Sequence, residues 1–178
     1  MEWDELNILR QDALLFFSKK RKREDIDRFC DYMDFVFCLI YAYGWKDAEE
    51  IIGIVPFRDG LDDKAVNRDI DGKTFRDRIT EDSTPEEILR IIDTEAHRNY
   101  NTGVYDAADV SGIPDIRKRW NTMLDDRVRD PHSYMEGMTV GLNDRFYTYT
   151  GDSTLYPGGF GVPELDINCR CWITLDIA

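Results

Sequence analysis

The chain has 178 residues, of which 42% are hydrophobic and 33% charged, a composition typical of a folded domain rather than a disordered chain. Its formal net charge of −13 argues against extensive direct binding to DNA, because phosphate recognition needs clustered lysine and arginine. No apolar run approaches the roughly 20 residues that span a bilayer, and the acidic segment 1–5 lacks the basic region of a signal peptide. We therefore expect a protein that is made and kept in a cytoplasm, or packed into something assembled there.

Apolar residues recur at steps of three and four in the first part of the chain, which is the period of an amphipathic helix. They predict one helix from about Leu6 to Phe17 and a second from about Glu24 to Ala42, separated by the basic run 19–23. Acidic residues flank that run, so we interpret it as a solvated helix end rather than a DNA contact.

Two glycines are expected to interrupt this helical part, since glycine is common just past a helix end. Gly44 is predicted to end the second helix, and a short third helix over 45–52 is predicted to close at Gly53. Residues 58–72 are polar and contain Asp-Gly pairs, so we expect a loop with little regular structure there.

The clearest helix start in the sequence is the motif Thr84-Pro85-Glu86-Glu87. It combines a hydroxyl N-cap, a proline at the first helical position and a glutamate at the third. The apolar pattern continues from there to about Val110, and Gly112 and Pro114 are expected to end the helix.

After Pro114 the apolar pattern changes to a period of two, which is typical of strands. The alternation is clearest over 116–123, and further candidates are 138–140, 145–149 and 169–177. Helices followed by strands predict an α+β fold, with a helical N-terminal half followed by a small antiparallel β-sheet module packed on a long helix. We divide the chain into a helical annex, 1–80, and an α+β module, 81–178.

Generic catalytic motifs are missing from the sequence. It contains no Gly-x-Gly-x-x-Gly, no phosphate-binding loop, no Gly-x-Ser-x-Gly and no His-Glu-x-x-His. His97 and His132 are the only histidines, which leaves few ways to build a histidine-based mechanism. We therefore predict that the protein is not an enzyme.

The second half instead carries a series of polar and aromatic motifs. They are Thr94-Glu95, Trp120, the group Asp125, Arg127, Arg129 and His132, then Gly137, Asp144, Phe146, Tyr156-Pro157, and finally Asn168-Cys169-Arg170-Cys171. In order and spacing, from Thr94 to Trp172, they resemble the Mu F-like minor head proteins of the phage head-morphogenesis family. That family's pattern is Arg-Thr-Glu on a helix, Trp, Asp-x-x-Arg-x-x-His, Gly, Phe, Tyr-Pro and a closing Asn-Cys-Arg-Cys. This chain has Asp93 where the family usually has arginine, which puts any role of that arginine in doubt.

The resemblance implies a minor component of a tailed-phage head. Family members associate with the portal vertex and procapsid, and some are linked to DNA packaging or delivery. By that resemblance we expect a virion protein in the capsid interior or at the portal vertex, made in the bacterial host cytoplasm. It would dock on portal, capsid or scaffolding proteins and influence packaging or ejection. The acidic chain favours a basic partner surface.

Three interpretations of the motif residues remain open. In the first, they are structural: side chains of Asp125, Arg127, Arg129, Asp144 and Arg170 pair with one another and hold long loops in place. Asn168 would then satisfy backbone groups at a turn.

The second interpretation is a transition-metal site, with zinc as the favoured ion. Cys169 and Cys171 would point to one face of a strand, and His132 would supply an imidazole. Asp125 or His97 would provide the fourth ligand. Simple burial of both thiols under the N-terminal helices is the alternative.

The third interpretation is catalysis by Glu95, Asp125, Arg129 and His132 as an acid–base set. It corresponds to a phage-encoded enzyme or a toxin-associated module that acts on a small molecule or a host protein. The spacing selects no substrate, and polar clusters are often structural ion-pair networks. A zinc-stabilised binding module is the remaining alternative function.

Overall fold

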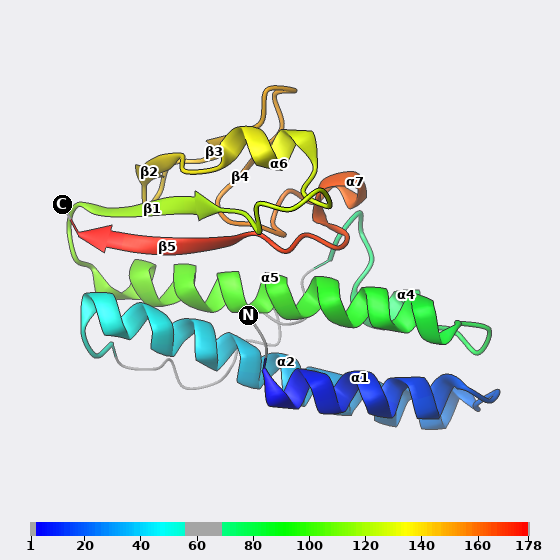
Figure 1. Cartoon of the computed structure of the whole chain (residues 1–178). Helices are drawn as coiled ribbons and strands as arrows, with labels where there is room; N and C mark the ends of the chain where they lie inside the picture. Colours follow the sequence, from blue (N-terminus) through cyan, green and yellow to red (C-terminus); the bar gives the residue numbers. More distant parts are fainter. Residues whose placement is uncertain (1–2, 56–68, 178) are drawn as a thin grey trace.

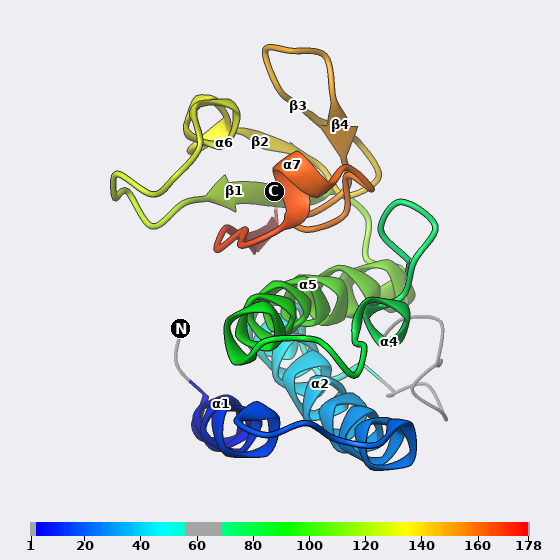
Figure 2. The same cartoon turned by 90° about the vertical axis from the view of Figure 1, so that its right-hand side faces the viewer.

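The computed structural model describes residues 3–55 and 69–177 of the chain. Three long helices dominate it: α1 (Asp4–Phe17), α2 (Arg23–Ile52) and α5 (Pro85–Ser111), with the one-turn helix α4 (Phe75–Arg78) before α5. α5 lies in the middle, with the strands on one side and α1 and α2 on the other (Figures 1 and 2).

The strands form a small antiparallel sheet on α5. β1 (Ile116–Asn121) is central, between β2 (Thr139–Gly141) and β5 (Trp172–Ile177). In the register of β1 with β5, Ile116 lies opposite Ile177 and Asn121 opposite Trp172. The predicted α+β fold, a helical N-terminal half followed by a small antiparallel sheet, is confirmed.

Short elements cover the far side of the sheet. They are the short helices α6 (Asp130–Met135) and α7 (Pro163–Asp166), and a hairpin of β3 (Phe146–Tyr147) with β4 (Ser153–Thr154). None of the helices α4, α6 and α7 was expected from the sequence, because each is too short to show the spacing of apolar residues that indicates a helix. The strand expected over 145–149 is correspondingly short.

The prediction that Gly44 ends a helix is wrong, because α2 is continuous through it to Ile52. A Cβ at Gly44 would lie 2.1 Å from the carbonyl oxygen of Tyr100, and a Cβ at Gly103 would lie 2.1 Å from that of Tyr41. The two glycines therefore let α2 and α5 cross with their backbones nearly touching. The third helix expected over 45–52 is the end of α2.

The predicted ends of the long helices are otherwise confirmed. Gly53, with φ 81°, follows α2 and donates its N–H to the carbonyl oxygen of Glu49. At the start of α5, the Thr84 hydroxyl accepts from the N–H of Glu87, and the Glu87 carboxylate accepts from the N–H of Thr84. α5 ends at Gly112 in the left-handed conformation.

The hydrophobic core is a single cluster that includes residues on both sides of position 80. Leu9, Phe37 and Ile40 contribute from the first part, and Ile92 and Trp120 from the second. The division into an annex and a module therefore stays a prediction. The loop expected over 58–72 lies largely outside the described residues, which resume with a turn bridged between residues 70 and 73. Among the helices described, none is both long and apolar enough to cross a bilayer.

Candidate metal centre

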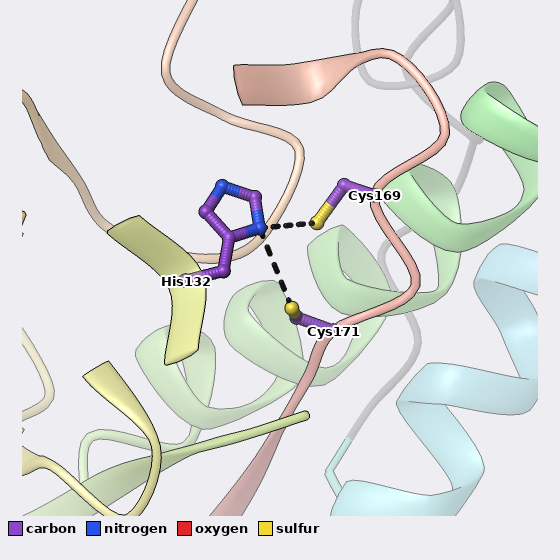
Figure 3. Close-up of side chains that lie close together, drawn as sticks. All are labelled: His132, Cys169 and Cys171. Carbon is purple, nitrogen blue, oxygen red and sulfur yellow. Dashed lines mark hydrogen bonds between the residues drawn. The ribbon is translucent and has the colours of Figure 1, made fainter. Parts of the chain in front are cut away.

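Three buried side chains from two distant segments converge within the sheet module. His132 comes from α6, and Cys169 and Cys171 come from the segment between α7 and β5 (Figure 3). The Nδ1 atom of His132 lies 3.7 Å from the Sγ of Cys169 and 3.5 Å from the Sγ of Cys171. Their candidate ligand atoms all lie within 4.8 Å of one another.

The two cysteines precede β5, so the expectation that both lie on a strand is wrong in detail. The chain turns at Asn168, which has φ 57°. After this turn, the sulfur atoms of both cysteines lie close to Nδ1 of His132.

Helix α5 holds the cysteine segment in place from below. The hydroxyl of Thr94 accepts the N–H of Asn168 at 2.9 Å. About two turns further along the helix, the side chain of Asn101 donates to the carbonyl oxygen of Cys171 and accepts the N–H of Ile173, both at 3.0 Å. Thr94 and Asn101 are seven positions apart and share a helix face. The role of Asn101 was missed from the sequence, because it is one of several polar residues in this buried stretch of α5 and nothing distinguishes it from the others.

Aromatic rings enclose His132. Phe160 stacks on the imidazole with centroids 5.7 Å apart and planes at 12°, and Trp120 meets it edge-on at 5.6 Å. The Nε2 atom of His132 is buried and has no hydrogen-bond partner among the described residues. Water is therefore largely kept from the ring, and its other nitrogen faces the thiols.

Cys169 and Cys171 shift each other's pKa in opposite directions. A hydrogen bond with Cys171 is the main cause that lowers the pKa of Cys169, and His132 lowers it further, against the effect of burial. The same hydrogen bond, together with burial, raises the pKa of Cys171. The ionised form is thus favoured at Cys169 relative to Cys171.

An ion pair closes one side of the site. The guanidinium of Arg170 donates to both carboxylate oxygens of Asp125, at 2.6 and 2.8 Å, and this contact lowers the pKa of Asp125 to about 2. Arg127 lies 3.6 Å from the same carboxylate, and Arg129 donates to the carbonyl oxygen of Ile167. The loop that carries Asp125 is thereby tied to the cysteine segment.

The remaining motif residues lie elsewhere in the module. Asp144 accepts the N–H of Gly141 in the turn after β2, and Gly137, with φ 75°, donates its N–H to the carbonyl oxygen of Trp120. Phe146 is buried against the Trp120 ring at 5.2 Å. These residues support the sheet rather than the cluster of thiols.

The residues considered for an acid–base set are engaged separately in the described structure. Glu95 is buried on α5, where its carboxylate lies 2.5 Å from the guanidinium of Arg98, and burial raises its pKa. Asp125 contacts Arg170, Arg129 contacts a carbonyl, and His132 contacts the thiols. The metal-ligand group among the described residues contains neither Asp125 nor His97, so their roles as ligands stay predictions.

A pocket of about 430 Å³ opens beside Cys169. Its lining is rich in arginine and consists of Arg10, Asp93, His97, Arg127, Arg129, Asn168, Cys169 and Arg170. Asp93, the departure from the family pattern, accepts from the guanidinium of Arg10 at 2.8 Å. A carboxylate at this position thus joins α5 to α1.

Comparison with known proteins places this module in a family. Over residues 62–174 the sequence matches the family described as phage Mu protein F like protein. A segment of 86 residues, 47% of the chain, is 37% identical to 17% of the NAD(+)–arginine ADP-ribosyltransferase EFV of Enterococcus faecalis (strain ATCC 700802 / V583). A segment of 79 residues, 44% of the chain, is 29% identical to 26% of the Minor head protein GP7 of Bacillus phage SPP1.

The chain thus spans about a quarter or less of the length of these two curated relatives. No solved structure matches it significantly. The family match covers more than half of the chain and contains α5, the cysteine segment, His132 and most of the sheet. The protein therefore belongs to the phage Mu protein F-like family.

Proposed function

We propose that this protein is a structural component of a phage head, a minor head protein that docks on the portal or procapsid during head morphogenesis. The observation that carries the proposal is the family match over residues 62–174, supported by the similarity to a minor head protein of a Bacillus phage. Its place would be the virion, in the capsid interior or at the portal vertex, after synthesis in the bacterial host cytoplasm.

Charge supports a basic protein partner rather than DNA. Aspartate and glutamate number 36 against 23 lysines and arginines. Such an excess repels phosphates and attracts a positively charged protein surface. Any influence on packaging or ejection would then act through the portal or capsid rather than through extensive contacts with the genome.

Co-sedimentation tests this proposal. The protein is made together with the portal, capsid and scaffolding proteins of its phage. It is expected to sediment with procapsids, and this association is expected to weaken as the salt concentration rises. Portal protein alone and capsid protein alone, each used as bait, identify the partner. Absence from purified heads, combined with failure to bind either bait at low salt, would contradict a head role.

The similarity to an ADP-ribosyltransferase raises a second candidate, an enzyme or toxin-associated module. The shared segment amounts to 17% of that transferase, which leaves most of its length without a counterpart here. We favour a non-catalytic module common to both proteins, since Glu95, Asp125, Arg129 and His132 each have other partners in this fold.

An assay with NAD⁺ and an arginine-containing acceptor separates the two candidates. The purified protein is expected to release no nicotinamide above background. Turnover by the wild type that disappears in Glu95→Gln or His132→Ala, with Arg117→Met as a control on the exposed face of β1, would replace the structural assignment with the enzymatic one.

A further inference from the structure

We infer that His132, Cys169 and Cys171 bind one zinc ion that fastens α6 to the segment leading into β5. This inference does not rest on the proposed head role, because it concerns ligands and distances within the chain. The three side chains are buried, and their candidate ligand atoms lie within 4.8 Å of one another.

The two sulfur–nitrogen distances fit a tetrahedral zinc ion. Zinc bonds thiolate sulfur at about 2.3 Å and imidazole nitrogen at about 2.0–2.1 Å, and a tetrahedral angle between them separates sulfur from nitrogen by about 3.6 Å. The two sulfur–nitrogen distances are 3.7 Å and 3.5 Å. Both sulfurs thus lie at the distance from Nδ1 that a shared zinc ion would give them.

Hydrogen bonding alone accounts less well for this convergence. The Nδ1 atom of a histidine carries either one lone pair or one N–H, so it serves one sulfur well. Here two sulfur atoms approach the same nitrogen from one side (Figure 3). An ion between the three atoms uses every one of them as a ligand.

The chemistry of the ligands selects the metal. Thiolate and imidazole ligands suit zinc and are poor ligands for magnesium or calcium, which prefer oxygen. Three protein ligands leave a fourth tetrahedral position. Cys169 also lines the arginine-rich pocket of about 430 Å³, so we assign that position to a water molecule supplied from the pocket.

The neighbouring contacts are those that a metal site needs around its ligands. The carbonyl of Cys171 is held by Asn101, the turn at Asn168 is held by Thr94, and Phe160 and Trp120 fix the ring of His132. Orientation of ligands by such surrounding contacts contributes strongly to affinity. The binding free energy of the ion then adds to the stability of the fold.

Metal analysis is the first test. Wild-type protein purified without chelator is expected to contain close to one zinc per chain, and Cys169→Ser, Cys171→Ser and His132→Ala are expected to lose it. Two matched controls, Cys30→Ser in α2 and His97→Ala in the pocket wall, are expected to keep it.

Because loss of a ligand can also unfold the module, the deciding measurement uses folded wild-type protein. Zinc is removed with chelator and replaced by cobalt, which is expected to give a thiolate-to-metal charge-transfer band and the visible bands of tetrahedral coordination. Saturation at one cobalt per chain supports the site. Folded wild-type protein that takes up neither zinc nor cobalt stoichiometrically would overturn the inference, whatever the outcome of the head-binding experiments.

Discussion

Lys118 is a cation buried inside the sheet module, on the same face of β1 as Ile116 and Trp120. Its ammonium group donates to the carbonyl oxygen of Leu142 at 2.5 Å and lies 5.0 Å above the ring of Tyr105. Burial lowers its pKa to about 8, opposed in part by Asp144. The period of the strand predicts which face Lys118 occupies, but not that its charged end is buried there.

Replacement of Lys118 by methionine tests this burial, because the two proteins should differ in how their free energy of unfolding depends on pH. Below about pH 8 the lysine is protonated in both states, so folding carries the full cost of burying the charge. Between about 8 and the ordinary value of 10.5, the unfolded chain binds more protons than the folded one, and stability rises with pH.

Urea unfolding of wild type and Lys118→Met from pH 7 to pH 10.5 is the measurement. The free energy of unfolding of the wild type, minus that of the variant, is expected to be flat below pH 8 and to increase above it. The facing charges of Asp144 and Arg145 remain in both proteins. A constant difference across the range would show that Lys118 titrates normally.

The pair Glu95–Arg98 allows a second test on α5. Their side chains are 1% and 3% exposed and lie 2.5 Å apart. Arg98→Met leaves a buried carboxylate without this cation, and such losses cost about 3–5 kcal/mol. Adding Glu95→Gln to that variant is expected to recover part of the loss. Chemical denaturation of the four proteins in a double-mutant cycle measures the coupling, and strictly additive effects would contradict the pairing.

At the scale of elements, the crossing of α2 and α5 depends on two glycines. Alanine in place of glycine normally stabilises a helix by about 1 kcal/mol. At Gly44 or Gly103 the added methyl group would meet a backbone oxygen at 2.1 Å, so the helices must separate.

We expect Gly44→Ala and Gly103→Ala each to destabilise the protein by several kcal/mol, the range of severe overpacking. Thermal and urea unfolding measure the effect. Lys46→Ala, on the exposed face of the same helix, is the control and is expected to be nearly neutral. An increase in stability at Gly44 would mean that the backbones do not approach as closely as described.

Element prediction succeeded where the signal is local. The capping box at Thr84 and the glycine at 112 predict α5 because both act within one turn of the helix. Gly44 is ambiguous in sequence, since a glycine that ends a helix and one that permits a crossing look alike. The α6 helix, with six residues, has no period to read.

At the candidate site, too, the sequence indicates the residues but not the distant contacts that position them. The structure brings His132, Cys169 and Cys171 together, and metal binding by them stays a prediction. Their common orientation depends on the turn at Asn168 and on Asn101, which binds backbone groups about 70 residues later in the chain. Such contacts between distant backbone atoms leave no pattern in the sequence.

At the scale of the whole molecule, one core links the helices to the sheet module. Ile88, Ile92 and Val104 of α5 are buried in the same core as apolar side chains of α1 and α2. Burial of apolar area is the main stabilising contribution in a protein of this size. The annex and the module are therefore expected to depend on each other.

Equilibrium unfolding tests this dependence. Helix content, the fluorescence of Trp45 in α2 and that of Trp120 in β1 are expected to change in one coincident transition. Single-tryptophan variants separate the two fluorescence signals. A fragment of residues 81–178 is expected to lack a cooperative transition of its own, and two separate transitions in the full chain would contradict this expectation.

The pairing of β1 with β5 also bears on the order in which the chain folds. It joins Ile116 to Ile177 across a connection that carries α6, the hairpin and α7. Closing so long a connection costs entropy before any strand contact is gained, which slows folding relative to helical proteins of similar size. His132 and Cys169 span 37 positions of the same connection. An ion bound between them would reduce the length of chain that must still be closed before β5 can pair with β1.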